Sequence, residues 1–289
     1  MGYGQSEPNV DAGVWEPASL GDYVWIDLNG NGLQDSGEQG VPGVTATLYY
    51  LSPNTGLFTP ISTTQTNNNG YYEFPSLISG TYQVFFDTPT GYTWTVPTAG
   101  NVISDSNVIT PSNGGTAPVV LNSGQQNPTI DGGLTPYAVL GDYVWEDIDH
   151  DGLQDAGEPG VNGVLVTLYR NGVSVSTTTT FNNAGQNGYY TFTNLISGTY
   201  SVTFGLPAGY TFTKVTANSG DGSINPGTLN DSNVTDRNLG TTNVITLNWG
   251  VQNPTIDAGL WRPASLGDYV WEDLNHNGQQ DDGNTGINM

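Results

Sequence analysis

Three twelve-residue segments carry the side chains of this chain with the clearest chemical potential. Loop one is DLNGNGLQDSGE from Asp27 to Glu38, loop two is DIDHDGLQDAGE from Asp147 to Glu158, and loop three is DLNHNGQQDDGN from Asp273 to Asn284. Each has a carboxylate or amide oxygen at positions 1, 3, 5 and 9 and a glycine at position 6, and the first two end in glutamate. This is the ligand spacing of an EF-hand calcium loop, so it predicts Ca²⁺ binding.

A simpler interpretation of one such loop is an Asx-rich turn held by side-chain to backbone hydrogen bonds, without a metal. Two complete matches favour calcium, and loop two contains five carboxylates where loop one contains three. Five like charges at short range repel strongly, so a cation is needed to neutralise them. His150 and His276 fall at position 4, which is not a ligand position. We expect both to be exposed, and a zinc role is the weaker alternative.

The segments around the loops predict strands, whereas an EF-hand has helices there. LGDYVW precedes every loop, and GVTATLYY or GVLVTLYR follows the two complete ones. Period-two alternation and regularly spaced glycines predict about seven strands in the first repeat, paired in a two-sheet sandwich. The expected strands are 19–26, 44–51, 61–66, 71–74, 81–87, 92–95 with 118–122, and 128–134.

Composition limits the partners that the chain could bind. It carries 27 carboxylates against four basic residues, a net charge of -23, which excludes nucleic acid and anionic membranes and favours cations. Cysteine is absent, so neither disulfides nor thiolate metal sites stabilise the fold. No stretch is apolar enough to span a membrane, and the first residues lack the features of a signal peptide. Because extracellular modules of this kind use millimolar calcium, we expect a secreted, bacterial-type cell-surface protein.

Internal repetition defines the organisation. The glycine of LGDYVW recurs at 21, 141 and 267, so one repeat is roughly 120 residues long, which is the size of a domain. We predict the terminal strand of a preceding repeat plus a junction at 1–16, repeat one at 17–134, repeat two at 135–260, and the start of a further repeat at 261–289. The junctions are short and contain proline, which predicts a stiff connection between repeats.

These motifs, in this order, resemble a known family. LGDYVW, the twelve-residue loop, GYYxFxxLxxGTYxV, PxGYTF, DSN and DAGL are similar to the calcium-binding B domains of SdrD-type bacterial surface adhesins. The resemblance implies an all-β fold of tandem Ig-like or prealbumin-like (Cna-B type) β-sandwich domains, which are extracellular and are made rigid by calcium. The ligands that it implies are Asp27, Asn29, Asn31, the Leu33 carbonyl, Asp35 and Glu38 in loop one; Asp147, Asp149, Asp151, the Leu153 carbonyl, Asp155 and Glu158 in loop two; and Asp273, Asn275, Asn277, Gln279 and Asp281 in loop three.

Two further features bear on the chemistry. Asn284 replaces glutamate at position 12 of loop three, which predicts a weaker or incomplete site. The family often has DSD where this chain has DSN, at 105–107 and 231–233, and a secondary metal site there with Asp131 or Asp257 is a further hypothesis. A Lys–Asn isopeptide bond, found in related domains, is not expected, because Lys214 is the only lysine.

The sequence therefore predicts an extracellular, calcium-stabilised structural protein that forms a stiff stalk, fibre or surface coat, and no enzyme, since no catalytic motif is apparent. We expect each calcium loop to lie beside the joint with the preceding domain. A binding module is the alternative, an adhesin arm that holds a glycan or host protein through variable loops such as 53–60 and 215–230. Self-assembly of the chain into a filament is a third hypothesis. Recurrence of Trp25, Trp145 and Trp271 at one strand position indicates packing more than sugar binding.

Overall fold

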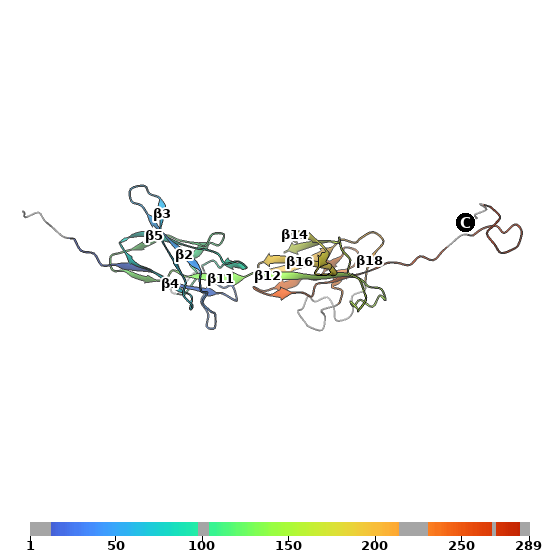
Figure 1. Cartoon of the computed structure of the whole chain (residues 1–289), viewed down its shortest axis with the longest axis horizontal. Helices are drawn as coiled ribbons and strands as arrows, with labels where there is room; N and C mark the ends of the chain where they lie inside the picture. The colour runs from blue at the N-terminus through green and yellow to red at the C-terminus, as the bar shows by residue number, and fades with distance from the viewer. Residues whose placement is uncertain (1–12, 98–103, 214–230, 268–269, 284–289) are drawn as a thin grey trace, which may run out of the picture.

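The computed structural model describes residues 13–97, 104–213, 231–267 and 270–283. Every regular element in these ranges is a β-strand. No helix long and apolar enough to cross a membrane occurs in the described part of the chain. Figure 1 shows two β-sandwiches that follow one another along the long axis of the molecule. The predicted all-β fold of tandem sandwiches is confirmed.

The strands of repeat one are divided between the two sheets of its sandwich. They are β1 (Ala18–Ile26), β2 (Thr45–Leu51), β3 (Phe58–Gln65), β4 (Tyr71–Leu77), β5 (Gly80–Phe86), β6 (Tyr92–Trp94), β7 (Val108–Thr110), β8 (Gly115–Thr116), β9 (Val119–Leu121), β10 (Gln126–Pro128) and β11 (Gly132–Pro136). One sheet has the order β10-β1-β11-β6 with β4 paired to β1, and the other has the order β3-β2-β5-β8-β7 with β9 paired to β5.

Repeat two follows the same plan. Its strands are β12 (Ala138–Glu146), β13 (Leu165–Arg170), β14 (Val173–Thr179), β15 (Phe181–Asn183), β16 (Gln186–Leu195), β17 (Gly198–Phe204), β18 (Thr211–Phe212), β19 (Val234–Asp236), β20 (Thr241–Thr242), β21 (Ile245–Leu247), β22 (Gln252–Asn253) and β23 (Ala258–Trp261). One sheet has the order β15-β16-β12-β23-β18 with β22 paired to β12, and the other has the order β14-β13-β17-β20-β19 with β21 paired to β17.

Alternating apolar residues fill each sandwich. In β5, Tyr82, Val84 and Phe86 point inward and are buried, as their spacing predicted, and the intervening residues are more exposed. Each repeat has a separate buried cluster, and no residue belongs to both clusters. Trp25 and Trp145 are fully buried, which confirms the packing role inferred from their recurrence.

Two strand predictions were wrong in detail. Residues 92–95 and 118–122 were expected to act together, but β6 pairs with β11 in one sheet whereas β9 pairs with β5 in the other. The expected strand 128–134 is divided into β10 and β11, which both lie parallel to β1. Residues 129–131 separate them, and this interruption brings Asp131 beside the backbone of Tyr23.

Loop one and loop two lie at the end of each repeat opposite to the one expected. Because β1 and β11 are parallel, loop one begins where β11 leaves repeat one, and the Asp27 N–H donates to the Leu134 carbonyl at 2.9 Å. Only Tyr137 separates β11 from β12, so this end of the sandwich adjoins repeat two. The prediction that loop one lies beside the preceding domain is therefore wrong. The sequence order of strand and loop does not reveal which end of the sandwich the strand points to.

Candidate metal centre

The first aspartate of each complete loop is anchored at the end of a central strand. Asp27 follows β1 and Asp147 follows β12, and both side chains are fully buried. The Asp147 N–H donates to the Leu260 carbonyl at 2.7 Å, just as Asp27 is held in repeat one. The two carboxylates therefore occupy equivalent, fixed positions in the two repeats.

Backbone N–H groups of the loop converge on this first carboxylate. Asp27 Oδ1 accepts from the Gly30 N–H at 2.7 Å, and Asp27 Oδ2 accepts from the Gly32 N–H at 2.8 Å. In loop two, His150 and Gly152 donate to Asp147 at 2.7 and 3.1 Å. These bonds wrap the loop around its first residue, as Asx turns do.

The glutamate at position 12 closes each loop. Glu38 accepts from the Leu28 N–H at 2.9 Å through one oxygen and from the Asp35 N–H at 3.0 Å through the other. Glu158 makes the same two contacts in loop two, with Ile148 and Asp155, at 2.6 and 2.9 Å. The carboxylate at position 12 thus faces both the start of the loop and its ninth residue, and position 12 supplies the bidentate ligand in EF-hand calcium loops.

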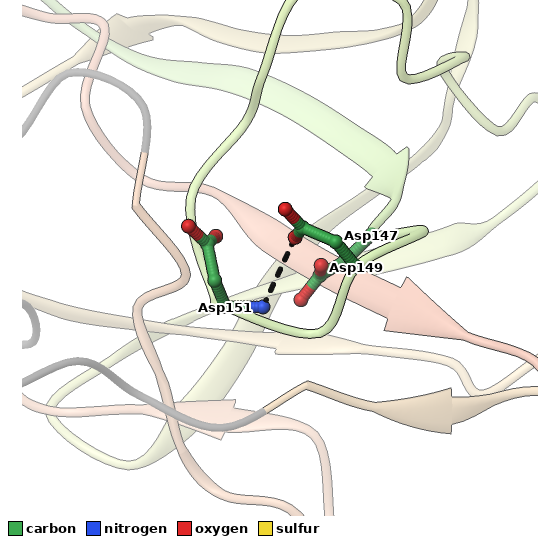
Figure 2. A group of neighbouring side chains, drawn as sticks. All are labelled: Asp147, Asp149 and Asp151. Carbon is green, nitrogen blue, oxygen red and sulfur yellow. Dashed lines mark hydrogen bonds between the residues drawn. The ribbon is translucent and has the colours of Figure 1, made fainter.

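In loop two the carboxylates gather into one cluster. Asp147, Asp149 and Asp151 each offer an oxygen, and these oxygens all lie within 4.8 Å of one another. Figure 2 shows the three side chains on a single turn of the loop. Calcium binds oxygens at about 2.3–2.6 Å, so ligands on opposite sides of the ion are roughly 5 Å apart. The cluster has the chemistry and the dimensions to hold a metal ion.

Loop one has the same shape but different electrostatics. Its positions 3 and 5 are Asn29 and Asn31, and both amide Nδ2 groups donate to Asp35 Oδ2 at 2.8 Å. The amides therefore offset part of the negative charge within the loop itself. Ionised aspartates at these positions in loop two have no hydrogen to donate, so their charges are not offset in this way.

The leucine at position 7 joins each of the two complete loops to the DSN segment of its repeat. Leu33 forms a β-bridge with Asp105, and Leu153 forms one with Asp231. The ladder bonds around the first bridge use the Gly32 carbonyl and the Gln34 N–H rather than the Leu33 carbonyl. The use of the Leu33 and Leu153 carbonyls as ligands stays a prediction.

A second group of carboxyls lies next to that bridge. Asp131 is almost fully buried, and burial followed by the charge of Asp22 raises its pKa to about 8. Burial also raises the pKa of Asp22 and of Asp105. An interaction between the side chains of Asp22 and Asp131 adds to the rise in the pKa of Asp131. Asp131 Oδ2 is buried and has no hydrogen-bond partner among the described residues.

Repeat two reproduces this group. Burial raises the pKa of Asp142 to about 7 and that of Asp257 well above its usual range, and Asp142 adds to the latter shift. The Tyr143 N–H donates to Asp257 Oδ1 at 2.9 Å, and the Asp257 N–H donates to the Asn233 side-chain oxygen at 2.6 Å. Asn233 of the DSN segment thus binds a backbone N–H group. The carboxyl oxygens of the group come from Asp142, Asp231 and Asp257.

Loop three keeps the local hydrogen bonds, although no sandwich surrounds it in the described part of the chain. Asn277 and Gly278 donate to Asp273, and Asn275 and Asn277 donate to Asp281. The Leu274 N–H donates to Asp282 at 3.1 Å, in the place that glutamate takes in the complete loops. Gln279, the residue expected at position 7, is exposed, and Asn284 lies outside the described residues.

Four contributors to these sites were not predicted from the sequence. Asp22 and Asp142 belong to LGDYVW, and the recurrence of a carboxylate inside a core strand was a usable signal. Thr213, whose hydroxyl donates to Asp147 Oδ2, gave no signal, because it is distant in sequence. Trp261, whose ring centre lies 4.6 Å from that of His150, also gave no signal, because it too is distant in sequence from the loop. Both histidines are exposed, as expected. Lys214 and the variable segment 215–230 lie outside the described residues.

Comparison with known proteins agrees with this architecture. The SdrD B-like domain model matches residues 18–134 and 138–260. The chain is 43% identical over 98% of its length to serine-aspartate repeat-containing protein D of Staphylococcus aureus (strain Newman), and 43% identical over 96% to serine-aspartate repeat-containing protein F of Staphylococcus epidermidis. It spans about a fifth of the former relative and 15% of the latter.

A solved structure of a streptococcal ancillary pilin matches 86% of this chain and 63% of its own, at 12% identity and a TM-score of 0.35. The family model alone matches well over half of the chain, in two adjacent copies that each contain one complete loop. The chain therefore belongs to the SdrD B-like domain family.

Proposed function

We propose that this chain is a calcium-stabilised structural segment of a cell-surface protein, in which tandem sandwiches form a stiff stalk. The observation that carries the proposal is the carboxylate cluster of loop two, with Asp147 fully buried and the oxygens of Asp149 and Asp151 within 4.8 Å. Repulsion among these carboxylates makes the cluster costly without a cation. The chain has only four basic residues that could supply the opposite charge. Similarity to surface proteins of staphylococci supports the location.

Calcium would act on stability and on the joint together. Loop one connects β1 to the rest of repeat one, and its first residue is bonded to Leu134 in the last strand. An ion that fixes the loop would therefore also fix the exit of the chain toward repeat two. We propose that repeats 17–134 and 135–260 fold as units and that each holds at least one ion through its complete loop.

The experiment is a comparison of the full chain with and without calcium. Calorimetric titration should show Ca²⁺ binding, and chelation should lower the melting temperature and expose the loops to protease. Glu38→Gln and Glu158→Gln each remove one bidentate ligand and should each weaken one site. Unchanged melting temperature and protease resistance after chelation would rule out the proposal.

A second cation in each repeat is favoured by the group formed by Asp22, Asp105 and Asp131. Asp105 Oδ1 and Asp131 Oδ2 are buried and lack a hydrogen-bond donor among the described residues. Buried carboxylates of this kind need either a proton or a cation. Asp22→Asn should then lower the number of calcium ions bound without affecting loop one, as counted by calorimetry. An unchanged count would assign the group to protons alone.

A further inference from the structure

The outer surface of loop one is in contact with repeat two. Gly30, at loop position 4, has a φ of 68°, and a Cβ atom built on it would lie 2.0 Å from Trp249 Nε1. Trp249 belongs to the turn 248–251 between β21 and β22. The indole therefore covers the backbone of the calcium loop at a point where any side chain would collide with it.

The turn that carries Trp249 is bonded to the joint. The Gly250 N–H donates to the Pro136 carbonyl at 3.0 Å, and the Val139 N–H donates to the Val251 carbonyl at 2.9 Å. Gly250 also lies against the Pro136 ring, where an added Cβ would be 2.8 Å from Pro136 Cγ. The backbone of the turn is thus fixed on the connection between the repeats, and this fixes the direction in which Trp249 points.

Repeat one has the same turn with a different residue at the contact. The Gly124 N–H donates to the Glu16 carbonyl at 2.9 Å, and Ser123 stands where repeat two has Trp249. The Ser123 hydroxyl accepts the Glu16 N–H at 3.0 Å. Both turns therefore hold the chain that enters their repeat, but only the turn of repeat two carries a large aromatic side chain toward the preceding loop.

Loop two presents a different surface at position 4. His150 has a φ of 67°, and its ring lies against that of Trp261 of the same repeat, with ring centres 4.6 Å apart and the planes tilted by 40°. Position 4 is the bare backbone of Gly30 in loop one. In loop two the same position is covered by the rings of His150 and Trp261, which belong to the same repeat. The surfaces of the two loops are not interchangeable as docking sites for an indole.

We propose that the outer surface of loop one is a docking site for an indole-bearing turn of the following repeat, and that docking and calcium binding at this loop are linked. Gly30 lies between the predicted ligands Asn29 and Asn31, and its N–H is bonded to Asp27. A change in loop conformation that accompanies loss of the ion moves the surface on which Trp249 rests. By reciprocity, undocking of Trp249 lowers the calcium affinity of loop one. The inference rests on the proposed calcium function.

The test measures the distribution of distances between the repeats. The chain has no cysteine, so Thr63→Cys and Thr177→Cys, at exposed positions of β3 and β14, allow specific spin labelling of the full chain. With calcium, Trp249→Ala and Gly30→Ala should broaden the distance distribution. Gly37→Ala is the matched control, because Gly37 also has a positive φ in loop one but has open space around it. Trp15→Ala controls for loss of an exposed tryptophan.

Calcium affinity is the second measurement, made by calorimetry in a Glu158→Gln background so that loop one dominates. Trp249→Ala should weaken binding by about fivefold or more, the usual lower range for linked sites. An unchanged distance distribution, or an unchanged affinity, would overturn the inference. Failure of the proposed function is distinct: the parent chain would then bind no calcium at all, whatever Trp249→Ala does to the distances.

Discussion

Exchange of two ligands between the complete loops tests the electrostatic reasoning directly. Asp149→Asn with Asp151→Asn gives loop two the residues that loop one has at positions 3 and 5. The substitution removes every pairwise repulsion among Asp147, Asp149 and Asp151, whose oxygens lie within 4.8 Å. The reverse exchange, Asn29→Asp with Asn31→Asp, is the matched control because it introduces the same repulsion into loop one.

The magnitude follows from these distances. Two unit charges 4.8 Å apart repel by about 0.9 kcal/mol at the dielectric constant of water, so the three pairs amount to about 3 kcal/mol. The value for water gives a lower limit, because Asp149 and Asp151 are exposed but Asp147 is buried. For a domain of this size, 1 kcal/mol changes the melting temperature by about 4 °C. Without calcium, we expect repeat two to melt roughly 10 °C higher after the exchange.

The assay is differential scanning calorimetry of the full chain, dialysed against chelator and then repeated with calcium. The exchanged loop two should gain stability without calcium and bind calcium more weakly, since two charged ligands become neutral. The reverse exchange should show the opposite pair of effects in repeat one. If the calcium-free melting temperatures do not move, the carboxylates are not close enough to repel, and the cluster is an ordinary hydrogen-bonded turn.

Three other outcomes are expected. Because burial raises the pKa of Asp131 to about 8 and that of Asp142 to about 7, the folded state holds protons that the unfolded chain releases above about pH 4. Their stabilisation is complete in acid and lost as the pH rises through 7 to 8, so the calcium-free melting temperature should fall from pH 5 to pH 8; a flat profile would contradict the assignment. Asp22→Asn should remove part of that dependence in repeat one, as seen in the same scans. Val84→Ala should destabilise repeat one by about 2 kcal/mol in chemical denaturation, with or without calcium, because Val84 is fully buried in the core; a change in calcium affinity would show that core and loop are not independent.

Much of this architecture could be predicted from local patterns. The alternation in β5 identified its buried face, and the spacing of loop two identified Asp147, Asp149 and Asp151 as neighbours. These predictions succeed because strands have a period of two and because a twelve-residue loop around one centre leaves little freedom. The recurrence of LGDYVW at each loop also located the strands that support them.

The features that could not be predicted from the sequence depend on contacts between distant parts of the chain. Asp22 and Asp131 come together only because β1 pairs with both β10 and β11, and no local pattern shows this pairing. The position of loop one beside the following repeat depends on the parallel direction of β1 and β11. Trp249 reaches Gly30 across the joint, and nothing in either local sequence indicates the other.

The parallel pairing of the first and last strands also bears on how the protein would respond to mechanical force. Val24, Trp25 and Ile26 of β1 pair with Gly132, Gly133 and Leu134 of β11, and β12 and β23 repeat this pattern. A pull along the chain enters β1 at its amino end and leaves β11 at its carboxyl end. The bonds between the two strands are then loaded in shear and must break together, rather than one after another as in an unzipped hairpin. Each repeat would therefore transmit tension through its most deeply buried strands.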